Sequence, residues 1–147
     1  MSIVVDANLV AALALPLPYA ERAAEEMMAW KRGGVELCAP MLLEYELASI
    51  LRKAVTANLM STDDALQAME RILALNIRCI PPTGQLHERA LAWAERLGQS
   101  KAYDAHYVAL AEVLGAEMWT ADGRLARNAR QVGVDWVRLV SASVEST

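Results

Sequence analysis

The sequence predicts a three-layer α/β domain, in which helices cover both faces of a parallel β-sheet. Five short apolar segments alternate with longer segments of helical periodicity, and no two-residue hairpin turn joins neighbouring apolar segments. The chain has 147 residues, of which 55% are hydrophobic, and this is enough apolar side chain for the core of one domain. We expect residues 1–147 to form that single domain, with a frayed polar tail over residues 141–147.

Three of the five predicted strands are short segments that end at a charged residue or a proline. The first run ends at Asp6, the second at Pro40 and the third at Pro81. In chain order we expect strands at Ile3–Val5, Val35–Ala39, Ile77–Ile80, Glu117–Thr120 and Val134–Val140.

The predicted helices begin at prolines or capping residues, and several end at glycines. Pro18 and Pro40 lie where helices start, and residues 61–64 (STDD) are typical of a capping box. Gly98 and Gly115 each end a helical segment. In chain order we expect helices over about 7–15, 19–32, 40–58, 61–76, 85–97, 102–114 and 123–131.

The net charge limits the classes of function. It is −4, from 14 basic and 18 acidic residues, which argues against a nucleic-acid binder covered in Lys and Arg. Two bound divalent cations would balance that charge, so the composition remains compatible with a metallonuclease. Arg124, Arg127 and Arg130 recur every third residue and form either a local basic patch or a solvated helix face.

Several features favour a cytoplasmic protein. The sequence has no apolar run of 18 residues, and the apolar start Met1-Ser2-Ile3 lacks the basic segment of a signal peptide. Cys38 and Cys79 have neither the spacing of metal ligands nor a second cysteine close by. We therefore expect both cysteines to be reduced and buried, and no association with a membrane.

Two acidic residues follow predicted strands. Asp6 comes after the first strand and Asp122 after the fourth, so both are expected at the carboxyl edge of the sheet, where α/β proteins bind ligands. Either residue could instead be an ordinary helix N-cap. A buried, unpaired carboxylate at Asp6 would be costly, so the sequence predicts a partner for it.

Other acids lie on predicted helices. Asp104 is near the start of a helix that is apolar almost all round, where it either caps that helix or faces a partner. Glu44 and Glu46 lie on opposite flanks of one apolar stripe, and periodicity does not choose between them. Either glutamate could also be solvated.

Taken together, converging carboxylates favour a hard cation. Several carboxylates in one pocket would repel one another unless a cation neutralised them, and an all-oxygen site suits Mg²⁺ or Mn²⁺. His87 and His106 have no ligand-like spacing with a cysteine, which argues against zinc. Such ions are suited to phosphodiester hydrolysis.

Four segments, VVDANLV, APMLLEYELASILRK, AYDAHYVALAEVLG and WTADGRLAR, resemble in order and spacing the four acidic motifs of PIN-domain ribonucleases. The resemblance is closest to the toxins of VapBC-type toxin–antitoxin pairs. It implies strand order 3-2-1-4-5, and it favours Glu46 over Glu44 because Tyr45-Glu46-Leu47 fits the family's motif. The metal-holding and catalytic acids that it implies are Asp6, Glu46, Asp104 and Asp122.

The resemblance also assigns lesser roles. Asn8 and Thr120 occupy positions that support the acids, and His106 stands where members often carry an apolar residue, which favours a core role over a substrate contact. We expect Lys101, Arg124 and Arg127 to bind substrate. The apolar helical segments over residues 19–30 and 40–60 could form interfaces with partners or ordinary core.

The implied function is that of an endoribonuclease that uses one or two Mg²⁺ or Mn²⁺ ions. The resemblance further implies an RNA substrate, a homodimer and a small antitoxin that covers the acidic groove. One alternative is a non-catalytic PIN domain that binds RNA or a protein partner. Another is a phosphohydrolase of the haloacid-dehalogenase kind, but that family needs a second Asp where this chain has Asn8.

Overall fold

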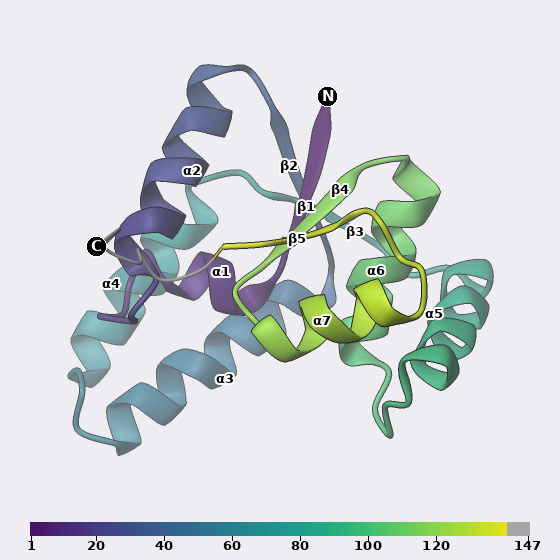
Figure 1. The fold of residues 1–147 in the computed structure, drawn as a ribbon. Coiled ribbons are helices and arrows are strands. Elements are labelled where there is room, and N and C mark those ends of the chain that lie inside the picture. The colour runs from purple at the N-terminus through teal and green to yellow at the C-terminus, as the bar shows by residue number, and fades with distance from the viewer. Residues whose placement is uncertain (141–147) are drawn as a thin grey trace, which may run out of the picture.

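A five-stranded parallel sheet organises the part of the chain that the structure describes, residues 1–140. The predicted tail over 141–147 lies outside the described residues. This computed structural model orders the strands β3-β2-β1-β4-β5, which confirms the predicted topology (Figure 1). The strands are β1 (Ser2–Val5), β2 (Glu36–Pro40), β3 (Arg78–Ile80), β4 (Glu117–Thr120) and β5 (Val137–Leu139).

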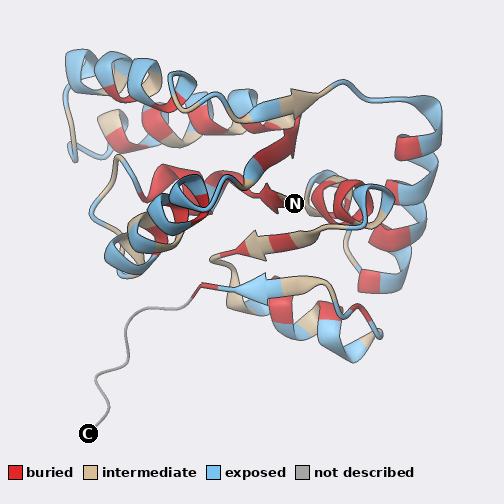
Figure 2. Cartoon of the chain, turned by 90° about the horizontal axis from the view of Figure 1, so that it is seen from above, coloured by how far each residue is buried: buried red, intermediate tan, exposed pale blue. Residues whose placement is uncertain are grey.

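Helices cover both faces of this sheet (Figures 1 and 2). Because β-α-β crossovers are right-handed, the crossovers from β1 to β3 place α1–α4 on one face. The chain then returns across β1, and the same rule places α5–α7 on the other face. In chain order the helices are α1 (Ala7–Ala11), α2 (Ala20–Arg32), α3 (Leu42–Thr56), α4 (Thr62–Leu73), α5 (Gly84–Leu97), α6 (Tyr103–Leu114) and α7 (Gly123–Gln131). Within residues 1–140, none of these helices has the length and apolar character needed to cross a membrane.

Two elements are clearly shorter than predicted. Helix α1 ends at Ala11 instead of continuing to Leu15. The N–H groups of residues 12–14 donate to carbonyls three residues back, so the chain leaves the helix in tighter turns, and Pro16 then disfavours helical backbone at Leu15. Strand β5 begins at Val137 instead of Val134. The Val134 N–H donates to the carbonyl of Ala129 at 2.9 Å, so this residue closes the end of α7 and does not extend the sheet.

Helix α6 is apolar almost all round because it is enclosed. It packs against β1, β2 and β4 on one side and against α5 on the other, and residues 107–111 are all buried. In β1, Ile3, Val4 and Val5 are at most 1% exposed. The centre of the domain is therefore β1 with α6 above it, and the residues that follow β1 are held rigidly.

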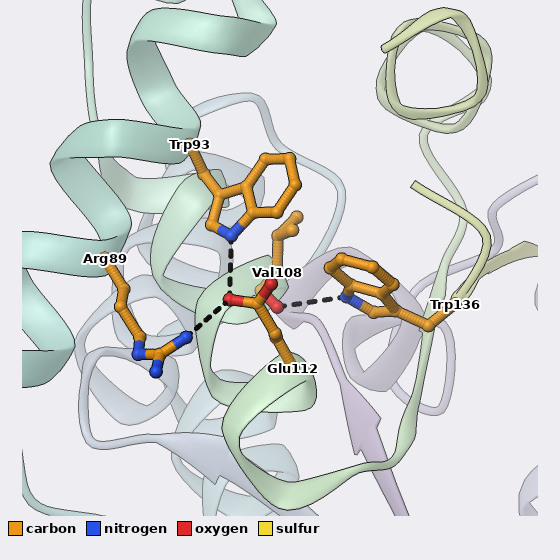
Figure 3. Close-up of polar contacts among 5 residues, drawn as sticks. All are labelled: Arg89, Trp93, Val108, Glu112 and Trp136. Atoms are coloured by element: carbon orange, nitrogen blue, oxygen red, sulfur yellow. Dashed lines mark hydrogen bonds and ion pairs between the residues drawn. The ribbon is translucent and has the colours of Figure 1, made fainter. Parts of the chain in front are cut away.

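A polar clasp joins α5, α6 and the segment before β5 (Figure 3). Glu112 Oε1 accepts hydrogen bonds from the Trp93 indole at 3.0 Å and from Arg89 at 3.1 Å. The Trp136 indole donates to the carbonyl of Val108 at 3.1 Å, and its ring meets that of Trp93 edge to face. The clasp thus ties α6 both to α5 and to the segment that leads into β5.

The two cysteines are free thiols, as predicted. Cys38 is buried in β2, whereas Cys79 in β3 is only partly buried, so the prediction of a buried residue is wrong for Cys79. Strand β3 lies at the edge of the sheet, where packing covers it less completely.

Candidate active site

An acidic pocket of about 380 Å³ lies at the carboxyl edge of the sheet. Strand order reverses between β1 and β4, and the α/β fold binds ligands at such a switch point. The pocket is lined by Asp6 after β1, Glu46 from α3 and Asp104 from α6. The other polar side chains in its wall are those of Asn8, Ser49, Lys53, Tyr45, Tyr103 and Tyr107.

Asp6 is a buried carboxylate held at both oxygens. It is 7% exposed, and its Oδ1 accepts a hydrogen bond from the Leu9 N–H at 2.9 Å, so it caps α1. The hydroxyl of Thr120 donates to Oδ2. The same hydroxyl oxygen accepts from the Asp122 N–H at 3.0 Å, so Thr120 ties the end of β1 to the start of α7. Asp6 is therefore both a helix cap and a member of the acidic pocket.

The charge of Asp6 has no cationic partner among the described residues. Ion pairs in residues 1–140 join Arg78 to Glu36, Arg89 to Glu112 and Arg138 to Glu117, and none of them involves a pocket acid. Burial, helped by the nearby charges of Asp104 and Glu46, raises the pKa of Asp6 to about 7. The hydrogen bonds from Thr120 and Leu9 lower this pKa only in part. A cation bound in the pocket would stabilise the ionised carboxylate.

Glu46 faces the pocket, and Glu44 does not. Tyr107 donates a 2.7 Å hydrogen bond to Glu46 Oε1. Burial raises the pKa of Glu46, the bond from Tyr107 lowers it, and the charge of Asp104 raises it. Glu44 is exposed, and its charge acts instead on Cys79 in β3. The structure thus places the glutamate that the family resemblance favours in the pocket.

Asp104 does not cap its own helix. Ala102 is the N-cap residue of α6, and no side chain makes a capping hydrogen bond there, so the cap alternative for Asp104 is wrong. Its Oδ2 accepts a long hydrogen bond, 3.4 Å, from the amide of Gln99. Burial raises the pKa of Asp104, and so does the charge of Asp122. The side chain is directed into the pocket from the first turn of α6.

Asp122 lies beside the pocket and is not part of its wall. It caps α7, and its Oδ1 accepts from the N–H groups of Arg124 at 3.0 Å and Leu125 at 3.2 Å. Its negative charge raises the pKa of Asp104 and contributes to the raised pKa of Tyr19. Asp122 therefore acts electrostatically on the pocket while serving as a cap.

The carboxylates of the acidic pocket suit a hard cation that keeps several of its water ligands. In the described part of the chain, no three Asp, Glu, His or Cys side chains form a ready-made cage for a metal ion. Mg²⁺ keeps several waters and is usually held by one or two carboxylates together with substrate phosphate, so a complete cage is not needed. Carboxylates without cationic partners, around a pocket that admits water, meet that requirement.

Three residues of this site were not found from the sequence. Tyr107 lies one turn after Asp104 on α6, and Lys53 lies two turns after Glu46 on α3, so helical spacing could have indicated both. Gln99 lies between α5 and α6, and no local pattern indicates its contact with Asp104. Lys53 is the only basic side chain in the pocket wall among the described residues.

The predicted substrate-binding residues lie elsewhere. Lys101, Arg124 and Arg127 are exposed, and none of them lines the acidic pocket. The Arg127 guanidinium lies against the backbone at Gly123, where a Cβ atom would come within 3.1 Å of it. The expected contacts of these side chains with a substrate therefore have no counterpart in the wall of the acidic pocket.

His106 is not a core residue. It is partly buried, its Nδ1 lies 2.6 Å from the carbonyl of Ala102, and its Nε2 lies 2.8 Å from His87 Nδ1. Since a carbonyl only accepts, His106 Nδ1 carries a proton, and in the neutral form of this histidine Nε2 accepts from His87. The prediction of a core role is therefore wrong, because a polar partner on α5 faces this residue.

Comparison with known proteins agrees with this geometry. A sequence model of the PIN domain matches residues 3–131. The chain is 39% identical over 124 residues to VapC ribonuclease Mb0985 of Mycobacterium bovis, covering 84% of this chain and 88% of the relative. It is 33% identical over 130 residues to Ribonuclease VapC3 of Pyrobaculum aerophilum, covering 86% and 93%.

The fold is similar to that of a solved structure. The crystal structure of PAE2754 from Pyrobaculum aerophilum matches with a TM-score of 0.65 at 23% sequence identity, covering 87% of this chain and 79% of that one. The family model spans nearly the whole sheet and all four acids. The chain therefore belongs to the PIN-domain family.

Proposed function

We propose that this protein is a metal-dependent endoribonuclease that hydrolyses RNA phosphodiester bonds in the acidic pocket. The observation that carries the proposal is the buried carboxylate of Asp6, which faces Asp104 and Glu46 and has no cationic partner in the described residues. The ribonuclease names of the VapC relatives support it. Membership in the PIN-domain family argues against the alternative of a haloacid-dehalogenase-like phosphohydrolase.

In this proposal the acids hold one or two Mg²⁺ or Mn²⁺ ions. Such an ion lowers the pKa of a water and neutralises phosphate charge. Asp6, Glu46 and Asp104 would hold the principal ion, and Asp122 would contribute to a second or water-mediated site. Thr120 keeps both oxygens of Asp6 in place together with Leu9, and Tyr107 orients Glu46. Asn8 lines the pocket beside Asp6, where its side chain would support the metal-holding acids.

Substrate binding in this proposal starts in the pocket and continues outside it. Lys53 is placed to bind a phosphate next to the acids. Lys101, Arg124 and Arg127 would contact phosphates further along the strand, because they are exposed and lie outside the pocket wall.

We further propose that the protein is the toxin of a toxin–antitoxin pair and acts in the cytoplasm as a homodimer. The names of its VapC relatives support the toxin role. A short neighbouring reading frame for a DNA-binding antitoxin would support it further. Co-expression provides the test: the neighbouring product should restore growth to cells that the wild-type protein arrests, and failure to do so would leave a role in RNA processing or decay.

The nuclease proposal is tested by cleavage of structured RNA with and without Mn²⁺. Wild type should cut only with the ion, and Asp6→Asn should not cut although it keeps the same circular dichroism spectrum. Glu44→Gln is the matched control, because Glu44 is exposed and outside the pocket. RNA that binds but is never cut would favour the non-catalytic alternative, and wild-type rates in Asp6→Asn would refute the role of Asp6.

A further inference from the structure

A second cavity adjoins the acidic pocket and differs from it in chemistry. This apolar groove, of about 360 Å³, is bounded by Met41 and Leu42 at the start of α3, Leu86 of α5 and Tyr103 of α6. In the described residues its wall contains no Asp, Glu, Lys or Arg side chain. Leu42, Tyr45 and Tyr103 line both cavities, so the groove and the pocket lie side by side.

Two exposed aromatic rings stand where the cavities meet. Tyr45 is 71% exposed and Tyr103 is 55% exposed, although each belongs to a well-packed helix. Within residues 1–140, no hydrogen bond holds either hydroxyl group. Both rings are therefore accessible to a ligand that lies across the boundary between the acids and the groove.

We propose that the apolar groove binds a base of the RNA nucleotide next to the scissile phosphate, stacked on Tyr45 or Tyr103. The inference rests on the proposed nuclease function. A phosphate held at the acids requires that a neighbouring nucleotide lie just outside the acidic pocket. A base is flat, uncharged and aromatic, so it matches an uncharged groove with exposed rings at its entrance.

The wall of the groove also contains polar groups that could pair with the edge of that base. His87 and His106 both line the groove, and their mutual hydrogen bond is 2.8 Å long. His87 donates from Nδ1, so its Nε2 is an acceptor in the neutral form. A base that donates from an exocyclic amine would pair with that atom, and the groove would then set a base preference beside the cut.

Stacking is tested by removing the ring and the base in turn. We would measure binding of short single-stranded RNA to the full chain in Ca²⁺, a hard cation that carboxylates also bind, and confirm that the RNA stays intact. A set of oligonucleotides carries one abasic nucleotide at successive positions. Tyr45→Ala and Tyr103→Ala are compared with Tyr45→Phe and Tyr103→Phe, which keep the ring. Leu91→Ala is the control, an exposed α5 residue outside the groove.

We expect at least one Tyr→Ala variant to bind intact RNA roughly 5- to 150-fold more weakly, as loss of one stacked base predicts. Both Tyr→Phe variants and Leu91→Ala should bind like wild type. At one position the abasic oligonucleotide should bind wild type with reduced affinity. Its affinity for the Tyr→Ala variant should be no lower than its affinity for wild type. That lack of additivity would assign the base to the groove.

Losses from the ring deletion and the base deletion that add in full at every position would overturn the proposal, and so would Tyr→Ala variants that bind RNA normally. Dimers that dissociate on Tyr45→Ala, with RNA binding unchanged, would show that a second copy of the chain covers the groove. A separate assay of RNA cleavage by wild type in Mn²⁺ tests the nuclease function independently of the groove. If wild type cuts RNA and the groove variants bind normally, only the groove assignment is wrong.

Discussion

Tyr107 and Glu46 are 61 residues apart in the chain, yet the tyrosine hydroxyl donates a 2.7 Å hydrogen bond to the glutamate across the acidic pocket. The bond joins α6 to α3, which pack on opposite faces of the sheet and meet at its carboxyl edge. Tyr107 is 1% exposed, so its ring is fixed and the hydroxyl is pre-positioned. The bond favours the ionised form of Glu46, the form that a metal requires, and so opposes the effect of burial, which raises the pKa of this group.

Removing that hydroxyl should raise the pKa of Glu46. In Tyr107→Phe the bond that lowers this pKa is lost, while burial and the charge of Asp104 continue to raise it. Protons would then compete with Mn²⁺ at a higher pH, so the acid limb of Mn²⁺ binding should shift to higher pH. Isothermal titration across pH measures this shift, and Tyr103→Phe should leave it unchanged. Stability should fall by about 1 kcal/mol, as for one hydrogen bond.

Stability without metal should fall as the pH rises from about 4 to 7. The pKa of Asp6 is about 7 in the folded chain and 3.8 as its ordinary value, so the folded state binds the extra proton between these limits. Protonated Asp6 therefore contributes its full stabilisation of the folded state below pH 4, and this contribution is lost above pH 7. The free energy of unfolding should fall by about 4 kcal/mol over this pH range. Urea denaturation with a chelator measures it.

Asp6→Asn is the control for that pH dependence. The variant lacks the buried titrating carboxylate, so most of the slope should disappear and it should be more stable than wild type above pH 7. Added Mn²⁺ should stabilise wild type there and have little effect on Asp6→Asn. Parallel pH curves for the two proteins would contradict the assignment of the slope to Asp6.

Lys53 should contribute one phosphate contact. In Lys53→Gln the affinity for single-stranded RNA should fall, and the slope of log affinity against log salt should decrease by about 0.7, the value for one single-strand phosphate contact. Arg52→Gln removes an exposed cation one residue earlier, outside the pocket, and should change that slope less. Fluorescence anisotropy over a salt series compares the two. An unchanged slope in Lys53→Gln would place Lys53 away from the strand.

The clasp at Glu112 should stabilise the fold without affecting cleavage. Glu112→Ala leaves the Trp93 indole without its acceptor in a partly buried position, so stability should fall by about 1 to 3 kcal/mol. Glu112→Gln keeps an oxygen for the indole and should lose less. Urea denaturation followed by tryptophan fluorescence measures both variants. A loss of cleavage at temperatures where Glu112→Ala is fully folded would mean that the clasp also positions the acids.

Sequence pattern was sufficient to predict the sheet and two of the acids at its edge. Alternating apolar runs and helices predict parallel strands, and parallel strands place the residues after β1 and β4 at one edge. Asp6 and Asp122 follow those strands, so their placement is a consequence of topology. Local chemistry also predicts the caps, because an Asp before a helix accepts from its first N–H groups, as both residues do.

By itself, then, the sequence determined the order of the elements, the strand ends and the acidic character of the edge. Only the tertiary structure decided which side chains meet across the pocket: Tyr107 with Glu46, Gln99 with Asp104, and Lys53 rather than Lys101 in the wall. It also decided that His106 faces His87 rather than the core. Periodicity fixes where a side chain lies on its own helix, whereas these contacts depend on how helices distant in sequence pack against one another.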